Sequence, residues 1–523
     1  MKKINRDNVN ISLQKIAKGS GYIFLGIIIS LVFSFFGRIL LIRIVTPQEY
    51  GIYSLSLVIV SISTTIAIMG FNEGVTRYVS YYRGKNEKKK ISSVIISSLL
   101  IQLYTGIVIS FFLYILAEYL SVAIFHDISL LNPLRIFAFS IPFMVMINLF
   151  ISIFRGFDNV KPKIIFQDFF RTFFLILLLL IIIFLNLDFI WIIISYTVSI
   201  IITFIILLLY FLKYNNKKSY LIRRILFKRN LPIAKKLILF SLPLLGFATL
   251  NMVMDWTDTI MIGFYKSSEM VGLYNGAIPL VQLIKSGLIA AGFIFVPVAS
   301  NMIAKDQFLE LGRIYQLVTK WIFSLTIPFA TIFIVYPNII LTFLMGQSYG
   351  AADTVLRIIT IGYLIHIILG LNGMSLMVFG KTKYLMLASL VGAIINIILN
   401  IFLIPVYSII GAAIASLVAY ATINILNSYK LYKISSIHPL TKKYLKPLLI
   451  SIFLLMIIFI IGKIITVTFW ILILLFVIYI TLYIILIILT KSLEREDIEM
   501  VKTIELKLGI NLNFIKRLME KFI

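Results

Sequence analysis

The sequence predicts an all-α integral membrane protein of about fourteen transmembrane helices, one that spans its membrane rather than lying on it. Of its 523 residues, 61% are hydrophobic and only 13% are charged, and the charges bunch between long apolar runs. A run of about 20 apolar residues crosses a bilayer as a helix, which satisfies the backbone hydrogen bonds that lipid cannot. Helices are expected at 20–44, 51–70, 92–120, 131–154, 164–187, 190–212, 237–264, 271–299, 314–340, 354–379, 384–404, 409–430, 445–465 and 468–490.

The distribution of lysine and arginine supports this helix count. When the N-terminus is placed in the cytoplasm, 40 of the 48 basic residues fall in the N-terminal segment, the cytoplasmic loops or the C-terminal tail. Cytoplasmic loops of membrane proteins carry such an excess, and one miscounted helix would scramble it. We therefore predict a multi-pass protein of the cell membrane with both termini in the cytoplasm. Its net charge of +27 then faces anionic lipid rather than nucleic acid.

The two halves of the chain look like repeats of six helices each. GRILLIRIVTPQEYGIY (Gly37 to Tyr53) aligns without gaps on DTIMIGFYKSSEMVGLY (Asp258 to Tyr274), an offset of 221 positions. Both segments leave an odd-numbered helix, cross a short outer turn and enter the next helix at Gly-x-Tyr. Few identities are involved, so chance is the alternative. Because six is even, such repeats are parallel, related by an axis along the membrane normal.

The long basic stretch between helices 6 and 7 sets the predicted domain boundaries. Helices 13 and 14 follow the second bundle as an added pair, and the tail reads as two short amphipathic helices. The predicted parts are a cytoplasmic N-terminal segment 1–19, an N-terminal six-helix bundle 20–212, a basic cytoplasmic linker 213–236, a C-terminal six-helix bundle 237–430, helices 13 and 14 within 431–490, and a cytoplasmic tail 491–523.

The sequence lacks the residues that several kinds of metal site and catalytic site require. It has no cysteine, so disulfides and thiolate metal sites are excluded, and its three histidines show no metal-ligand spacing. The sequence contains neither a Walker-type phosphate loop nor a defensible Ser-His-Asp spacing. We therefore expect no cofactor, no metal site and no enzymatic activity.

Four patterns resemble the polysaccharide-biosynthesis flippases of the O-antigen (Wzx) type, over helices 1 to 12. The most specific is Arg-x-Leu-x-x-Arg-x-x-x-Pro-x-Glu-Tyr-Gly-x-Tyr, from Arg38 to Tyr53. The others are Gly70 with Glu73-Gly74, Arg77-Tyr78 and Gly84-Lys85; Asp255 and Asp258 with Gly263 and Val271-Gly272-x-Tyr274; and Phe379-Gly380-Lys381-Thr382-Lys383. The superfamily that this family is part of also holds the lipid II flippases and the MATE exporters.

The resemblance implies transfer of a polyprenyl-(pyro)phosphate-linked oligosaccharide from the inner to the outer leaflet, for cell-surface polysaccharide or glycoprotein assembly. It implies two six-helix bundles around a central cavity, working by alternating access. It also implies membrane lipid and a coupling ion, H⁺ or Na⁺, as partners, with polysaccharide polymerases or glycosyltransferases as further candidates and no nucleic acid. Many family members have twelve helices, so the role of helices 13 and 14 is open.

Three cations within the apolar runs suit the phosphates of such a substrate, because an uncompensated charge in hydrocarbon costs several kcal/mol or more. Lys285 lies near the middle of helix 8, too deep for easy snorkelling, and pairing with a carboxylate is its alternative. Arg38 lies below the outer end of helix 1, where snorkelling to the headgroups is the alternative. Arg171 lies at the inner end of helix 5, where Asp168, three residues earlier, is expected to share its face and could simply neutralise it.

The acidic residues within the helices suit gating or ion coupling. Asp255 and Asp258 share a face of helix 7, and two such carboxylates repel, so at least one should hold a proton or a cation. Pairing with Lys285 or Arg38 is the alternative. Glu73 and Arg77, which close helix 2 on the cytoplasmic side, suit an inner gate or a helix-end ion pair. A buried core histidine is the expected role of His366, ahead of a proton carrier.

Two other function classes compete with the flippase. A MATE-like exporter coupled to protons or sodium would favour acidic and aromatic groups over cations, and the pattern in helices 1 and 2 decides against it. A polymerase or ligase acting on the same lipid would need a large external loop, and no external loop here exceeds about fifteen residues.

Overall fold

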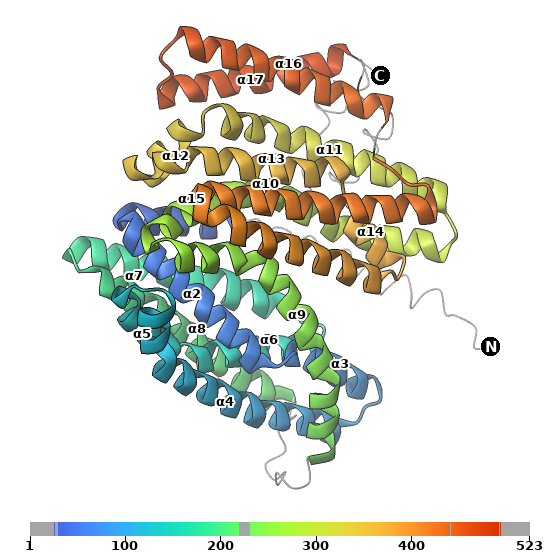
Figure 1. The fold of residues 1–523 in the computed structure, drawn as a ribbon. Helices are drawn as coiled ribbons and strands as arrows, with labels where there is room; N and C mark the ends of the chain where they lie inside the picture. Colours follow the sequence, from blue (N-terminus) through green and yellow to red (C-terminus); the bar gives the residue numbers. More distant parts are fainter. Residues whose placement is uncertain (1–25, 27–29, 219–230, 440, 491, 493–523) are drawn as a thin grey trace. The chain divides into compact units, whose positions relative to one another are not determined.

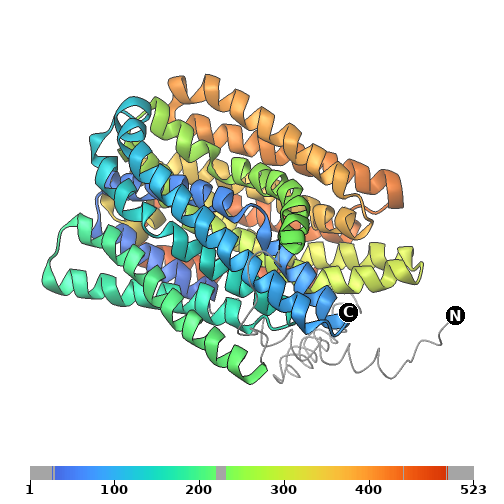
Figure 2. The same cartoon turned by 90° about the horizontal axis from the view of Figure 1, so that it is seen from below.

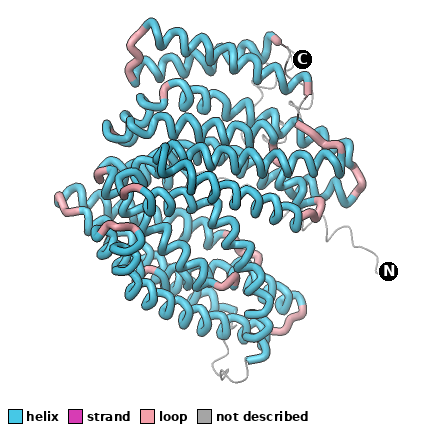
Figure 3. The backbone as a smooth tube through the Cα atoms, in the orientation of Figure 1, coloured by secondary structure: helices cyan, strands magenta, loops and turns pink. Residues whose placement is uncertain are grey.

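The computed structural model describes residue 26 and residues 30–218, 231–439, 441–490 and 492. The described chain is built of helices joined by short turns, and it contains no strand (Figure 3). The predicted N-terminal segment, nearly all of the tail with its two amphipathic helices, and the centre of the basic linker lie outside these residues. The prediction of an all-α membrane protein is confirmed.

The chain divides into two compact units, each described here by itself. One unit comprises Gly26–Gly276 with Asn400–Ile409, and the other contains Ala277–Leu399 and the chain from Ile410 onward. The first unit, called the N-unit, therefore holds the predicted N-terminal bundle together with helix 7 and the first turns of helix 8. The second unit is called the C-unit.

The N-unit is a bundle of helices with short connections (Figure 1). Its α7–α8 hairpin can be followed in Figure 2. Its helices are residues 30–44, α2 (Pro47–Ile68), α3 (Phe71–Gly84), α4 (Lys88–Tyr119) with a π-helical turn (Leu120–Ile124), α5 (Leu131–Ala138), α6 (Ile141–Gly156), a π-helical segment (Lys163–Phe170), α7 (Arg171–Leu185), α8 (Phe189–Lys218), α9 (Leu231–Tyr265) and the beginning of α10 (Ser268–Ala304).

The C-unit contains the remainder of α10 and the C-terminal helices. The two spans predicted at 384–404 and 409–430 join in α15, which breaks at Ser408, where φ is 51°, three residues after Pro405. The other helices are α11 (Phe308–Val335), α12 (Pro337–Met345), α13 (Asp353–Leu369), α14 (Asn372–Val378), α15 (Thr382–Ser435), α16 (Lys442–Ile464) and α17 (Phe469–Leu489).

Local sequence explains how the second predicted span begins and bends. The Thr46 side chain accepts a hydrogen bond from the backbone of Glu49, whose carboxylate accepts one from the Thr46 backbone in return, a capping box that starts α2. At the other end Met69 and Gly70 both take left-handed backbone angles, which separates α2 from α3. The two helices nevertheless form one apolar stretch long enough to span.

Within the described residues, nine helices are long and apolar enough to cross a membrane, and ten if the bent pair Ile128–Ala138 and Ile141–Gly156 forms one span. Every predicted span is helical over most of its described residues, with breaks inside three of them at 139–140, 336 and 370–371. The count of fourteen stays a prediction.

Inside the N-unit, α2 and the first turn of α10 cross with their backbones in contact. A Cβ atom on Gly51 would overlap the Ser268 carbonyl oxygen and lie 2.9 Å from the Gly272 nitrogen. A Cβ atom on Gly272 would overlap the Pro47 carbonyl oxygen and lie 3.0 Å from the Gly51 nitrogen. Only glycine allows helices to approach so closely, as small residues do at many membrane helix interfaces.

This contact is reciprocal in the way that a two-fold axis requires. Gly51 matches Gly272 and Pro47 matches Ser268 in the alignment of the two halves, each at the offset of 221. Gly51 contacts Ser268, and their counterparts Gly272 and Pro47 contact each other in the same way. Such exchange of equivalent contacts is the signature of an isologous interface. The internal repeat stays a prediction, and this geometry has the form that it would impose.

Helices 13 and 14, seen here as α16 and α17, are tied to α11 by buried tyrosines. The Tyr336 hydroxyl, at the end of α11, donates to the Ile458 carbonyl of α16 over 2.8 Å. Thr331 of α11 and Tyr479 of α17 share a hydrogen bond of 3.2 Å. Since lipid offers these hydroxyls no partner, the bonds hold the added pair firmly on the C-unit.

We expect alanine at Gly51 or Gly272 to destabilise the protein by about 1–3 kcal/mol, because overpacking forces backbones apart. The measurement is the melting temperature of the purified protein in detergent. The loss of stability in the double variant should be smaller than the sum of the losses in the two single variants, since both methyl groups crowd one contact. Gly246→Ala is the matched control, because a Cβ there meets no atom within 4 Å. Single alanine variants that melt like the wild type would show that the crossing tolerates side chains.

The absence of native cysteine makes the predicted orientation directly testable. Ser267→Cys lies in the exposed turn between α9 and α10, and Asp306→Cys lies in the exposed turn between α10 and α11. A membrane-impermeant maleimide should label the first in intact cells and the second only after lysis. The reverse pattern would place both termini outside.

Candidate functional site

Lys285 lies near the middle of α10 and faces an aromatic cluster of the C-unit. Its Nζ is 5.8 Å from the ring centroid of Tyr363 on α13. The Tyr363 ring in turn lies 5.3 Å from that of Tyr420 on α15, at an interplanar angle of 37°. His366, one turn after Tyr363, is within electrostatic range of the Lys285 ammonium group. We call Lys285, Tyr363, His366 and Tyr420 the C-unit cluster.

The ammonium group of Lys285 has no carboxylate partner among the residues that the structure describes. Its side chain and that of Tyr363 are half-buried rather than packed away. A cation at this depth of a membrane protein is costly unless it faces water, a counter-ion or a ligand. Within the described chain, the predicted alternative of a lysine paired for packing is therefore not what is found.

Arg38 and Arg171 lie around one group of tyrosines in the N-unit. Both guanidinium groups are within electrostatic range of Tyr53 and Tyr196. These two tyrosines are buried and meet edge to face, with ring centroids 5.9 Å apart. The structure thus brings together two of the three predicted cations in one part of the N-unit, Arg38 from residues 30–44 and Arg171 from the start of α7.

Asp168 and Arg171, for which mutual neutralisation was the predicted alternative, form no ion pair within the described residues, although the Arg171 charge is within electrostatic range of the Asp168 carboxyl. The expectation assumed α-helical spacing, in which residues three apart share a face. Asp168 instead lies in the π-helical segment Lys163–Phe170, directly before α7 begins at Arg171, so α-helical spacing does not apply between the two residues. Such segments are often found at functional sites.

Asp258 is buried in the N-unit and held by neutral donors. Tyr274 of α10 donates to one carboxylate oxygen over 2.5 Å, and the Asn400 amide of α15 donates to the other over 2.8 Å. Asp255, one turn earlier on α9, is exposed. The two carboxylates of the predicted pair therefore have different surroundings. Close by, Lys266 at the end of α9 donates to the Pro405 carbonyl over 2.9 Å, a second tie to the break in α15.

Glu73 and Arg77 have separate partners in the first two turns of α3. Glu73 pairs with Arg155 of α6 over 3.1 Å, so the alternative of a Glu73–Arg77 pair is not found. The Arg77 guanidinium lies 4.2 Å from the ring centroid of Phe240 on α9, a cation–π contact. Arg77 therefore joins α3 to α9, whereas Glu73 ties α3 to α6.

Sequence reasoning missed Lys320, which it counted among the basic residues on the cytoplasmic side. Lys320 lies inside α11 and is buried, and its Nζ donates to the Ser492 carbonyl over 3.4 Å. Its position within the expected span 314–340 is the signal that could have singled it out. It is a second cation within a helix of the C-unit, and its hydrogen bond ties it to the chain that follows α17.

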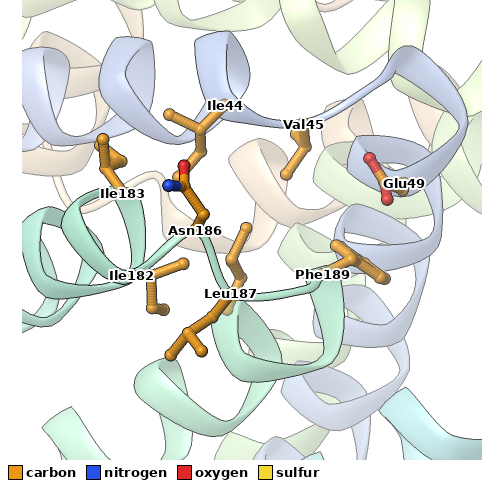
Figure 4. A pocket seen from close by; sticks show the side chains of 9 residues that line it. Ile44, Val45, Glu49, Ile182, Ile183, Asn186, Leu187 and Phe189 are labelled. Carbon is orange, nitrogen blue, oxygen red and sulfur yellow. The ribbon is translucent and has the colours of Figure 1, made fainter.

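A cavity of about 230 Å³ lies in the N-unit between the turn that precedes α2 and the turn that joins α7 to α8 (Figure 4). Its lining side chains are apolar apart from Asn186 and Glu49, and Glu49 already caps α2. It is lined by Ile44, Val45, Glu49, Ile182, Ile183, Asn186, Leu187, Phe189 and Ile192. Within the described residues, no group of histidine and carboxylate side chains is arranged to hold a metal ion.

Comparison with known proteins identifies two related families. A sequence profile described as polysaccharide biosynthesis protein matches residues 16–303, more than half of the chain. A second profile, MatE, matches residues 243–402.

Three curated proteins are similar in sequence. An uncharacterized membrane protein of Methanocaldococcus jannaschii is 22% identical over 84% of this chain and 88% of its own length. The probable low-salt glycan biosynthesis flippase Agl15 of Haloferax volcanii is 23% identical over 35% of this chain and 39% of that protein. The probable multidrug resistance protein NorM of Pasteurella multocida is 31% identical over 35% of this chain and 41% of that protein.

Solved structures share the fold. The lipid II flippase MurJ in an inward closed conformation has a TM-score of 0.68 at 18% identity, over 89% of this chain and 98% of that one. An inward-facing multidrug resistance MATE transporter of the MOP superfamily has a TM-score of 0.63 at 13% identity, over 78% of this chain and 94% of that one. With more than half of its length matched by the first profile, this chain belongs to the polysaccharide biosynthesis protein family.

Proposed function

We propose that this protein carries a polyprenyl-(pyro)phosphate-linked oligosaccharide from the inner to the outer leaflet by alternating access, for cell-surface polysaccharide or glycoprotein assembly. The observation that carries the proposal is Lys285, a cation near the middle of a membrane helix with no carboxylate partner in the described chain. A phosphate crossing hydrocarbon needs such a charge to lower its barrier. No covalent bond of the substrate changes in this step.

The similar proteins support this substrate class. One relative is named as a probable glycan biosynthesis flippase, and one structure of the same fold is a lipid II flippase. The match to the polysaccharide biosynthesis family covers Arg38, Arg171 and Lys285, the three cations assigned here to substrate phosphate. Arginine suits that role because its guanidinium binds phosphate through two parallel hydrogen bonds.

We assign gating and ion coupling to the acidic residues. Asp258 joins α9, α10 and the break in α15 through Tyr274 and Asn400, so a change in its protonation would alter three elements together. Asp255 on the same helix and Asp168 at the inner end of helix 5 are further candidates for this role. The coupling ion in this proposal is H⁺ or Na⁺.

Arg77, with Glu73 beside it, is the proposed inner gate. Its contact with Phe240 joins α3 to α9, two helices from different predicted bundles, and opening the cytoplasmic side would break it. The proposal places both termini in the cytoplasm and the protein in the cell membrane, where polymerases or glycosyltransferases of the same glycan are its expected partners.

A MATE-like exporter is the second candidate. The MatE profile match over 243–402 and the 31% identity to NorM over 200 residues favour it. Such an exporter would use acidic groups for organic cations, whereas an unpaired lysine would repel them. Sensitivity of deletion cells to organic cations separates the two candidates.

We expect cells lacking this protein to accumulate lipid-linked oligosaccharide on the cytoplasmic leaflet. The wild-type chain should restore the normal distribution, and Lys285→Ala should not, because the phosphate would lose its cation. The measurement is the leaflet distribution of the extracted lipid, probed by an impermeant oxidant of sugars. Lys463→Ala is the matched control, since this lysine is exposed at the end of α16.

Restoration by Lys285→Ala would remove Lys285 from the site and leave the flippase standing. A normal leaflet distribution in the deletion cells, combined with new sensitivity to organic cations, would favour the exporter instead.

We expect Asp258→Asn to lower transport roughly tenfold or more, because its amide NH₂ would face the donor of Tyr274 or Asn400. Its transport should also lose any dependence on an imposed pH or sodium gradient, a readout that packing alone would not change. Asp255→Asn is measured beside it, and Asp306→Asn in an exposed turn is the control. Full transport by both Asp255→Asn and Asp258→Asn would disprove the gating role.

A further inference from the structure

Tyr363 and Tyr420 differ from the Tyr50–Tyr53 pair in their surroundings. Tyr50 and Tyr53 stack with centroids 6.2 Å apart, but both are buried and present no open ring face. Tyr363 and Tyr420 are each only half-buried. They lie beside a cation that has no carboxylate partner in the described chain. An accessible aromatic pair next to an open charge is an arrangement that binds ligands.

The Tyr363 side chain presents both a ring and a hydroxyl at this place. Among the described residues its hydroxyl has no hydrogen-bond partner, and the hydroxyl is not sealed from the surroundings. A phenol at membrane depth needs a partner, because lipid supplies none. Lys285 and Tyr363 therefore both offer donors toward one place in the C-unit, with the ring pair as its wall.

The chemistry of a glycosyl phosphate matches these groups. Its phosphate is an anion for the ammonium group, and a pyranose presents a flat face of C–H bonds that packs on an aromatic ring, with hydroxyls at its rim. The sugar and its phosphate are bonded directly, which suits a ring and a cation 5.8 Å apart. Binding of a phosphate without a sugar would require only the Lys285 ammonium group. The two tyrosines would therefore serve to recognise the sugar.

We propose that the C-unit cluster is a subsite for the junction between the phosphate and the first sugar of the substrate. Lys285 binds the phosphate, and the Tyr363–Tyr420 pair stacks on the first sugar. This inference rests on the proposed function and adds substrate selectivity to it. The protein selects glycosylated polyprenyl phosphate over bare polyprenyl phosphate. Such selection would prevent futile transport of the unloaded lipid carrier.

The test compares the binding of two probes to the purified full chain in nanodiscs, measured by native mass spectrometry. The probes are polyprenyl phosphate and the same lipid bearing a single hexose. The wild type should bind the hexose-bearing lipid roughly five- to tenfold more tightly, the scale of one aromatic contact. Tyr363→Leu should abolish the preference, and Tyr363→Phe should keep most of it because the ring remains. Lys285→Gln should weaken both probes.

Tyr429→Leu is the matched control, because this tyrosine lies on the same helix as Tyr420 but is 62% exposed and away from the cluster. Equal wild-type affinity for the two probes would overturn this inference and leave the proposed function to its leaflet assay. A preference that survives Tyr363→Leu would also overturn it. Wild-type protein that binds neither probe would overturn both proposals.

Discussion

The contact of α2 with the first turn of α10 is the constraint on which the N-unit depends. Two backbones meet at Gly51 and Gly272, and neither position has room for a side chain. Tyr53, two residues after the first glycine, faces the charges of Arg38 and Arg171. Tyr274, two residues after the second, holds Asp258. One close crossing thus positions the tyrosines of both polar groups in this unit.

Charges at membrane depth are accommodated in four different ways. Asp258 accepts hydrogen bonds from the neutral donors Tyr274 and Asn400, and hydrogen bonds of this kind stabilise a carboxylate. Arg38 and Arg171 lie beside buried tyrosines, and Lys320 donates to a backbone carbonyl. Lys285 alone among these faces an accessible aromatic pair. An uncompensated charge in hydrocarbon costs several kcal/mol or more. A ligand of opposite charge therefore gains most binding free energy at Lys285.

Much of the fold followed from the sequence, because hydropathy and the positive-inside rule act on single segments. The glycine and tyrosine pattern around Gly51 and Gly272 also marked a contact of real importance. The site was harder. Asp168 and Arg171 were expected to share a helix face, but a π-helical segment, which leaves no clear trace in composition, changes their spacing. Asn400, which donates a hydrogen bond to Asp258, lies 142 residues away in the sequence, and no local sequence pattern predicts such a long-range bond.

The reciprocal crossing also bears on how such a chain could have arisen. If the two halves descend from one six-helix ancestor, the segments that cross here once met across the interface of a homodimer. In a homodimer every substitution alters both sides of that interface at once. A substitution of a glycine at the axis would therefore place two new side chains in the same contact. Fusion of the two copies released the rest of each half to diverge, and Lys285 in one half and the Arg38–Arg171 pair in the other would be products of that release.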